Sequence, residues 1–338
     1  MTNIKDISEI FYVRQDGTHL RQLTDDKQFV HYADFISNSS KILYVQSNVE
    51  SGSQTLYTLD LLSGQKDSIC TANIFQSTHS VDEPPYKRLH ISSNGIDVYF
   101  ASWNTNDAVL IPRDIYRVNI LTKQITNLTK SESNYRINEF TVSSNESLIV
   151  FSKTEDPRRI SSLDALDLAS GVKTNLYHSP ADNCLFPQWL QDGKRIFFIE
   201  TDYAVGKARL LHTDSGNTLS TINVDPRVGT YFPKVFSNDK VILDRKDGSG
   251  LYVLFDLHSF SFSNLNIPGT AKPYPTQDES QVLFFNPQWS ICSINVSDLS
   301  ERKLILNPQN SGNTVLPQAS RSNAEILFLS VQTIEVRR

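Results

Sequence analysis

Hydrophobic and polar positions follow one phrase that recurs along most of the chain. The phrase is a short strand, a polar turn, an apolar strand, a variable loop, a third strand ending in Asp-Leu-x-Ser-Gly or a similar turn, and a fourth strand. Its clearest copy occupies residues 32–45 and 55–64. The second strand of each copy is a short apolar run, as at 42–45, 195–199 and 282–285. Such runs predict strands that are buried on both faces.

The period of this repeat predicts the architecture. Copies begin near residues 32, 86, 135, 184, 229 and 271, so that successive starts are 54, 49, 49, 45 and 42 residues apart. The polar turns use Asn, Asp, Gly or Ser, which tolerate a left-handed φ or hydrogen-bond to their own backbone. A repeat of this length with four short strands is typical of a β-propeller blade, whose two faces are covered by neighbouring blades. We therefore predict an all-β chain of four-stranded antiparallel blades.

The two ends of the chain complete one another. The last copy, residues 314–338, supplies only the first two strands of the phrase, and residues 8–25 read as a third and a fourth strand. Joining them makes one blade from both termini and hides two sheet edges that would otherwise promote aggregation. The prediction is a seven-bladed β-propeller that occupies residues 1–338 as a single domain, with six or eight blades as the alternatives. The expected blades are 30–72, 86–129, 135–178, 184–224, 229–268, 271–306, and 314–338 together with 8–25.

Composition and charge narrow the class of partner and the compartment. The chain has 18 Phe and 13 Tyr against 1 Met, which favours strands. A formal net charge of −5 at pH 7 and the lack of a Lys/Arg run argue against nucleic acid as a partner. No apolar run reaches the roughly 18 residues of a membrane span, and the first residues carry no apolar signal segment. The three cysteines, Cys70, Cys184 and Cys292, lack CxxC spacing and are expected to be reduced. We expect a cytoplasmic protein that binds neither nucleic acid nor membrane.

Two phrases carry a resemblance to a known family. Asp-Gly-Thr-His-Leu-Arg-Gln-Leu-Thr at 16–24 and Gln-Asp-Gly-Lys-Arg-Ile-Phe-Phe at 191–198 resemble the PD40 repeat of TolB-like propellers. The Ser-Pro-Asp-Gly turn of that repeat is changed here to Ser-Asn-Ser-Ser, Ser-Ser-Asn-Gly and Ser-Asn-Asp-Lys. The resemblance covers nearly the whole chain and implies the propeller fold. It does not identify a function, because such propellers serve as periplasmic binding proteins, peptidase entrance domains and polysaccharide lyases.

One branch of that resemblance implies a metal, and the sequence departs from it. The cytoplasmic oligogalacturonate lyases are similar in blade count and phrase style, and they are expected to hold a divalent metal on histidines, including a His-x-His before the Pro of a first strand. The matching places here read Thr-Val-Leu-Pro at 314–317 and Tyr-Phe-Pro at 231–233, without histidine. Metal-dependent lyase activity therefore does not carry over, and we expect neither a metal nor a cofactor.

Basic and aromatic residues recur in the loops before each first strand and between second and third strands. In a propeller these loops meet on one face around the channel. The candidate ligand-binding residues are Arg88, Arg113, Arg136, Lys272, Trp103, Trp289, Tyr135, Tyr203 and Tyr231, with His31 and His90 at first strands. Guanidinium groups bind carboxylates and phosphates bidentately, and aromatic rings stack on flat or sugar-like groups. This predicts an anionic small molecule or an acidic protein partner. The alternative is that these are ordinary solvated loop residues packed on their neighbours.

Polar residues at comparable first-strand places leave two roles open. Asp34, Glu139 and Gln188 either line the channel or hydrogen-bond to backbone between blades. Three functions remain compatible with the sequence. We favour a binding protein for an anionic ligand or partner; the others are a metal-independent lyase, isomerase or cyclase in the same channel mouth, and a structural subunit. The sequence does not decide whether the protein is an enzyme.

Overall fold

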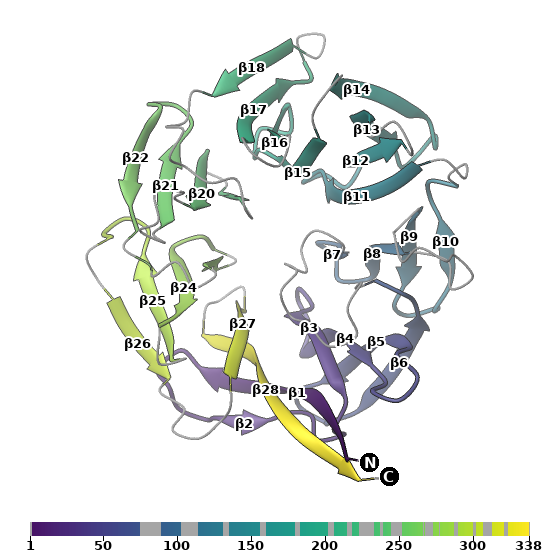
Figure 1. The fold of residues 1–338 in the computed structure, drawn as a ribbon, viewed down its shortest axis with the longest axis vertical. Helices are drawn as coiled ribbons and strands as arrows, with labels where there is room; N and C mark the ends of the chain where they lie inside the picture. The colour runs from purple at the N-terminus through teal and green to yellow at the C-terminus, as the bar shows by residue number, and fades with distance from the viewer. Residues whose placement is uncertain are drawn as a thin grey trace. The chain divides into compact units, whose positions relative to one another are not determined.

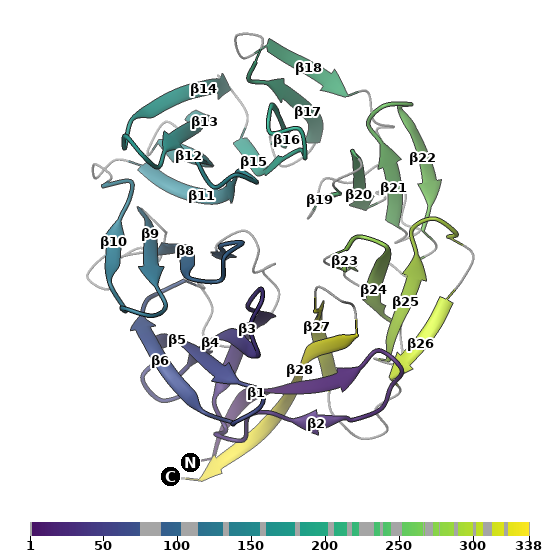
Figure 2. The same ribbon diagram turned by 180° about the vertical axis from the view of Figure 1, so that it is seen from behind.

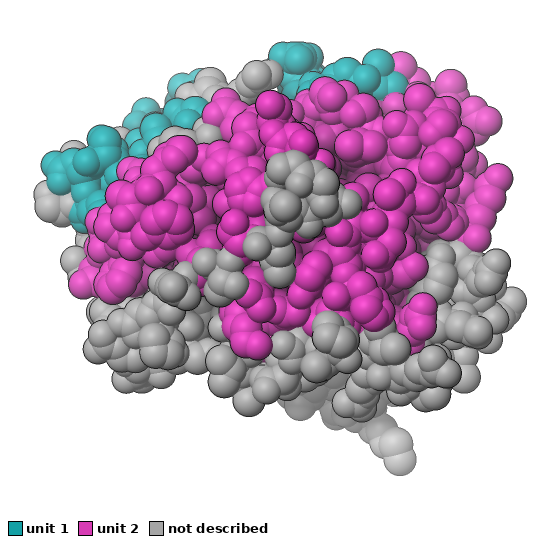
Figure 3. Space-filling view, turned by 90° about the horizontal axis from the view of Figure 1, so that it is seen from above, with its two compact units in different colours: residues 1–85, 93–96, 270–338 teal, residues 86–92, 97–269 magenta. Residues whose placement is uncertain are grey.

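A computed structural model describes residues 2–74, 89–102, 114–130, 135–155, 160–179, 183–201, 206–214, 218–222, 233–236, 239–244, 252–265, 267, 273–276, 278–286, 290–299, 302–306, 313–320 and 324–337. Every regular element in these ranges is a β-strand (Figure 1). The chain divides into two compact units, coloured separately in Figure 3. The first contains residues 1–85, 93–96 and 270–338, and the second contains 86–92 and 97–269.

The first unit holds an eight-stranded and a four-stranded sheet. The larger sheet has the order β27-β28-β1-β3-β4-β5-β6, with β2 paired to β1. Its strands are β1 (Thr2–Arg14), β2 (Arg21–Gln22), β3 (Phe29–Phe35), β4 (Lys41–Ser47), β5 (Gln54–Asp60), β6 (Lys66–Thr71), β27 (Asn313–Ala319) and β28 (Glu325–Arg337). The smaller sheet contains β23 (Tyr274–Pro275), β24 (Gln281–Phe285), β25 (Ile291–Asn295) and β26 (Arg302–Leu306) in sequence order.

The two terminal strands pair with each other. β1 and β28 run antiparallel from Thr2 opposite Arg337 to Arg14 opposite Glu325. The N- and C-terminal strands lie side by side in both views (Figures 1 and 2). The predicted sharing of one sheet by the chain ends is thus confirmed, although β1 begins at Thr2 rather than near residue 8.

The second unit holds four four-stranded antiparallel sheets. Within each of them the four strands pair in sequence order. The strands are β7 (Leu89–Ile91), β8 (Asp97–Ser102), β9 (Asp114–Asn119), β10 (Ile125–Asn127), β11 (Tyr135–Val142), β12 (Leu148–Glu155), β13 (Ile160–Asp167), β14 (Lys173–Ser179), β15 (Asn183–Trp189), β16 (Arg195–Thr201), β17 (Gly206–His212), β18 (Thr218–Ile222), β19 (Lys234–Val235), β20 (Lys240–Asp244), β21 (Tyr252–Asp256) and β22 (Ser261–Asn264).

The number of separate sheets differs from the predicted number of blades. Five sheets of four strands stand alone, so a count of sheets does not give seven. The eight-stranded sheet arises because β1 meets β3 through the parallel pair Ser8–Phe29. The Ser8 hydroxyl reinforces that contact, since it donates to Val30 O and accepts from Val30 N, each at 2.6 Å.

The core is made where neighbouring sheets cover each other. In the first unit Ile10, Ile42, Leu283 and Leu327 belong to one buried cluster, although they lie far apart in the sequence. In the second unit a separate cluster joins side chains of β16 and β17 to those of β20 and β21. The second strands of the repeat, such as β4 and β16, are buried along almost their whole length. This is the burial that their continuous apolar runs predict.

A threonine locks the fourth strand of some repeats to the third. Ile10 N donates to Thr24 Oγ1 at 2.9 Å, and the Thr24 hydroxyl donates to the buried carboxylate of Glu9 at 2.5 Å. The second unit repeats this arrangement with Ile115, Thr129 and Asp114. The Leu-Thr pair at both places therefore stabilises the packing of the fourth strand against the third.

The turn between third and fourth strands is organised by an acidic or amide side chain. Asp60 Oδ1 accepts from the backbone N–H groups of Leu62 and Ser63, each at 2.9 Å. The N–H of Ser63, followed by the hydroxyl of Ser40, lowers the pKa of Asp60 to about 2. The same bonds recur in the second unit at Asn119, Asp167 and Asp256.

Candidate functional site

Most of the predicted ligand-binding residues lie outside the described residues. These are Arg88, Arg113, Lys272, Trp103, Trp289, Tyr203 and Tyr231. Tyr135 opens β11, where its backbone pairs with Glu155 and its side chain is outside the description. Arg136, His31 and His90 remain.

The two histidines are held inside their sheets. His31, in the first unit, is 2% exposed; its Nε2 lies 2.6 Å from Ser47 Oγ, and its ring meets Phe29 edge-on. His90, in the second unit, lies on β7 with its ring 6.1 Å from that of Tyr99. Burial lowers the pKa of His90 to about 4, so that this side chain is neutral at pH 7. Arg136 is half-buried on β11, opposite Thr154.

Two of the polar first-strand residues hydrogen-bond to the backbone of the next sheet. Gln188 donates from Nε2 to Pro233 O at 2.7 Å and accepts at Oε1 from Val235 N at 3.0 Å. Glu139, only 6% exposed, accepts from the backbone N–H of Phe186. Both residues lie on first strands and reach the backbone at the first strand of the following sheet. For these two the structure supports the interblade hydrogen-bond role over channel lining.

Asp34 bonds within its own strand instead. It accepts from the Tyr32 hydroxyl at 2.8 Å and from Phe35 N at 2.8 Å. Burial, with the charge of Asp34, raises the pKa of Tyr32 well above its usual value. The pair is therefore a fixed, un-ionised tyrosine beside a carboxylate at neutral pH.

A buried carboxylate also joins two sheets of the second unit. Glu200 accepts from the hydroxyls of Tyr177 and Ser179, each at 2.7 Å, and from the guanidinium of Arg209 at 2.5–2.8 Å. Burial opposes ionisation, but these donors outweigh it and lower the pKa of Glu200. Glu200 therefore connects β14 of one sheet to β16 and β17 of the next by hydrogen bonds.

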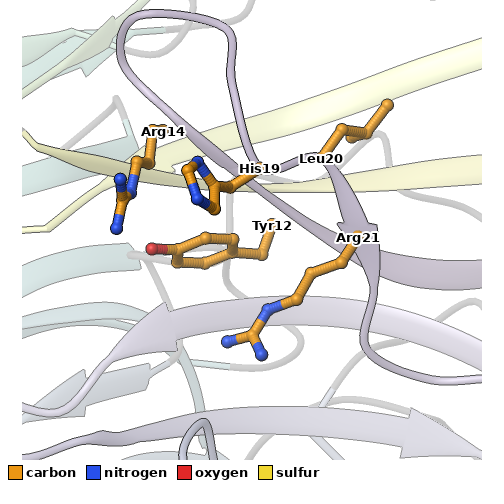
Figure 4. A pocket seen from close by; sticks show the side chains of 5 residues that line it. All are labelled: Tyr12, Arg14, His19, Leu20 and Arg21. Atoms are coloured by element: carbon orange, nitrogen blue, oxygen red, sulfur yellow. The ribbon is translucent and has the colours of Figure 1, made fainter.

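A hollow of about 430 Å³ lies at the turn between β1 and β2 in the first unit. Tyr12, Arg14, His19, Leu20 and Arg21 line it (Figure 4), and we call it the hairpin pocket. Tyr12 is buried and the other four side chains are exposed. The Tyr12 hydroxyl points toward the side on which Arg14 lies, and Leu20 points away from the ring (Figure 4). The pocket thus combines two guanidinium groups, an imidazole and an aromatic ring.

The local sequence explains how the pocket forms. Tyr12 and Arg14 are two residues apart on β1 and so share one face, and Tyr12 is paired across the hairpin with Arg21. Gly17, at φ 81°, donates to Arg14 O at 2.8 Å. A Cβ at that position would lie 2.6 Å from Ile305 O, so that only glycine allows this close approach to β26. His19 also has a left-handed φ, of 59°, which directs the chain from the turn into β2.

Contacts within the pocket fix the charged groups. The Arg21 guanidinium carbon lies 4.7 Å from the centre of the Tyr12 ring, and its Nη2 donates to Leu61 O at 3.1 Å. The Tyr12 hydroxyl donates to Glu325 Oε1 at 2.7 Å. Burial, and then this bond, raise the pKa of Tyr12. Glu325 stands opposite Arg14 in the β1–β28 register and brings a negative charge to the rim.

The hairpin pocket was not among the sequence candidates, which were sought in other loops. The β1–β2 turn lies at the same end of its sheet as the β27–β28 turn, away from the loop that enters β27. The sequence feature that indicates the pocket is the grouping of Arg14, His19 and Arg21 around Asp16-Gly17. As sequence, that stretch indicates the repeat alone.

No three His, Cys, Asp or Glu side chains in the described ranges group closely enough to hold a metal ion. None of the elements in these ranges is a helix long and apolar enough to cross a membrane. Cys184 and Cys292 are buried thiols, and burial raises the pKa of the partly exposed Cys70 to about 11.

Comparison with known proteins identifies the fold. No protein-family model and no curated protein matches the sequence. An oligogalacturonate lyase solved in complex with manganese is similar with a TM-score of 0.70 and 13% identity over 98% of both chains. The oligogalacturonate lyase of Vibrio parahaemolyticus gives 0.68 and 11% identity over 97% of this chain and 98% of that one. A TolB of Agrobacterium tumefaciens gives 0.51 and 16% identity over 98% and 100%.

These similarities confirm an all-β propeller fold of the kind found in TolB and the oligogalacturonate lyases. The predicted resemblance to TolB-like propellers is therefore correct for the fold. Identities of 11–16% show the fold alone and transfer no ligand or activity.

Proposed function

We propose that this chain is a β-propeller binding protein that recognises an anionic ligand. The observation that supports this is the hairpin pocket, where Arg14, His19 and Arg21 surround the Tyr12 ring in a protein of formal net charge −5. Cationic side chains gathered against an aromatic ring suit a carboxylate or a phosphate.

The geometry favours binding because one guanidinium is already in place. Arg21 is held by the Tyr12 ring and by Leu61 O, so that less side-chain freedom is lost when an anion arrives. Arg14 makes a side-chain hydrogen bond with the Tyr12 hydroxyl, so that both guanidinium groups lie beside the same ring. An anion there would accept charge-assisted hydrogen bonds, which are stronger than neutral ones. The carboxylate of Glu325 repels a bound anion and so lowers the affinity of the pocket for it.

The loop face predicted from the sequence remains a second proposed location. Arg136, half-buried on β11, is the described arginine of that set. If the ligand binds there, loss of Arg136 should weaken binding while changes at the hairpin pocket should not.

Isothermal titration and thermal unfolding with citrate, inorganic phosphate and galacturonate oligomers test the proposal. An anion at about 100 times its dissociation constant should add about 2.7 kcal/mol to the free energy of unfolding. The double variant Arg14→Gln/Arg21→Gln should lose this effect, and Lys41→Gln, which removes one exposed positive charge from β4, should retain it. Equal binding by the double variant and the wild type would refute the hairpin pocket, and loss in Arg136→Gln instead would place the ligand at the loop face.

We also propose that the propeller is a single domain of seven blades. The eight-stranded sheet divides between β1 and β3 into two groups of four, β27-β28-β1-β2 and β3-β4-β5-β6. The parallel pair Ser8–Phe29 is the contact that joins them. A crystal structure of the full chain tests this count, and six or eight blades around the axis would overturn it.

A further inference from the structure

We infer that the hairpin pocket takes an acidic segment of a partner protein, in which an Asp or Glu is flanked by apolar side chains. This inference rests on the proposed function, since it requires that the pocket bind anions. It goes further by stating which class of anion the surface fits.

The pocket is open in a way that suits an extended ligand. Four of its five lining side chains are exposed, and only Tyr12 is buried. Small-molecule sites usually enclose most of their ligand. A free anion would therefore leave most of its surface in water here. A chain that places one carboxylate in the pocket and continues across the surface buries more.

Apolar side chains flank the charged centre. Leu20 is 48% exposed at the pocket rim, and Leu62 is 87% exposed on the turn that carries Leu61. The bond from Arg21 to Leu61 O ties these two turns together. A guanidinium with an exposed leucine on each of the two turns it joins matches an acidic residue with apolar neighbours.

Both turns are held by internal hydrogen bonds. Asp16 accepts from the N–H of Thr18 at 2.9 Å and from its hydroxyl at 2.6 Å, which together lower the pKa of Asp16. Asp60 holds the turn that carries Leu62 through the N–H groups of Leu62 and Ser63. A surface that is ordered in advance loses less entropy on binding a peptide.

The carboxylates near the pocket predict the direction in which one substitution should change the affinity for an acidic peptide. Asp16 bonds to Thr18 and its charge also acts on Arg14 and His19, whereas Glu325 lies opposite Arg14 and accepts from Tyr12. Glu325→Gln retains an acceptor for the Tyr12 hydroxyl and removes the opposing charge. An acidic peptide should therefore bind this variant more tightly than the wild type, by roughly two- to ten-fold.

A random peptide display library screened on the folded, full-length protein provides the experiment. We expect enriched peptides that carry Asp or Glu next to Leu, Ile, Val or Phe. A synthetic peptide of the enriched sequence should lose roughly ten-fold or more in affinity for Arg14→Gln/Arg21→Gln and a few-fold for Leu62→Ser. Leu121→Ser, at the equivalent place of the turn that begins at Asn119, should bind as the wild type does.

The outcomes separate this inference from the proposed function. If citrate binding depends on Arg14 and Arg21 but the library yields no acidic consensus, or Leu62→Ser is silent, the pocket takes small anions and the inference fails alone. If neither citrate nor peptide binding depends on the two arginines, both fail. Circular dichroism of each variant confirms that loss of binding is not loss of fold.

Discussion

Replacing Gln188 with Leu tests whether first-strand polar residues hold the sheets together. The side chain spans from β15 to β19 and makes two hydrogen bonds, to Pro233 O and from Val235 N. β19 contains Lys234 and Val235, and in the described residues its ladder is the one with β20. Gln188 is therefore the described side chain that ties this short strand to the preceding sheet.

The expected cost follows from the bonds that are lost. Each neutral hydrogen bond contributes about 1 kcal/mol net, and a buried N–H left without a partner adds about 1–3 kcal/mol. Since Gln188 is half-buried, water can replace part of what is lost. We expect Gln188→Leu to lower the free energy of unfolding by about 2 kcal/mol. Gln188→Glu retains the acceptor for Val235 N but faces Pro233 O with a carboxylate, and it should cost at least as much.

Urea unfolding and hydrogen exchange measure the two parts of this prediction. With a denaturant slope of about 3 kcal/mol/M, a loss of about 2 kcal/mol moves the midpoint by about 0.7 M. The amide of Val235 should exchange faster in Gln188→Leu. Gln191→Leu, an exposed position in the turn that follows β15, serves as the control and should change neither quantity. An unchanged midpoint and unchanged exchange at Val235, together with lost citrate binding, would show that Gln188 contacts ligand instead.

Three further predictions follow from the turns and the buried histidine. Asp60→Asn retains the turn acceptor but removes a carboxylate whose folded pKa is about 2, so it should lose less stability than the wild type as the pH falls from about 4 to 2. His90 has a folded pKa of about 4 against about 6.5 in an unfolded chain. Unfolding therefore takes up a proton between these values, and stability should fall by up to about 1.4 kcal/mol per pH unit as the pH drops through that window. His90→Gln should remove this slope in urea titrations at each pH. Phe260, at φ 54°, occupies the turn position where Gly64 and Gly171 stand in other repeats, and Phe260→Gly should raise the unfolding free energy by up to about 1 kcal/mol; a lower melting temperature would refute this.

The strand repeat could be predicted because it depends on local chemistry. Continuous apolar runs, polar turns and the complementary ends indicated sheets that the observed pairing contains. The length of β1 could not be predicted in the same way. Its residues Thr2–Ile7 mix polar and apolar types and are ordered by pairing with β28, a contact that no alternation reports.

The roles of single polar residues depended on contacts across the sequence. Glu139 and Gln188 looked equally fit to line a channel, and the backbone groups that they bind lie 47 and 45 residues away. No spacing rule identifies which backbone group is left without a partner in a neighbouring sheet. The same limit applies to His31, whose bond to Ser47 joins residues 16 positions apart in the sequence.

The hairpin pocket lies where the chain departs from its own turn chemistry. In four other repeats an Asp or Asn at the end of the third strand accepts from the N–H groups two and three residues on, as Asp60 does. Between β1 and β2 the acid is Asp16, set within the turn and bonded to Thr18, and His19 takes the left-handed φ. At this turn Arg14 and Arg21 lie beside one ring, that of Tyr12. This departure from the turn of those four repeats supports the binding role that we propose for the pocket.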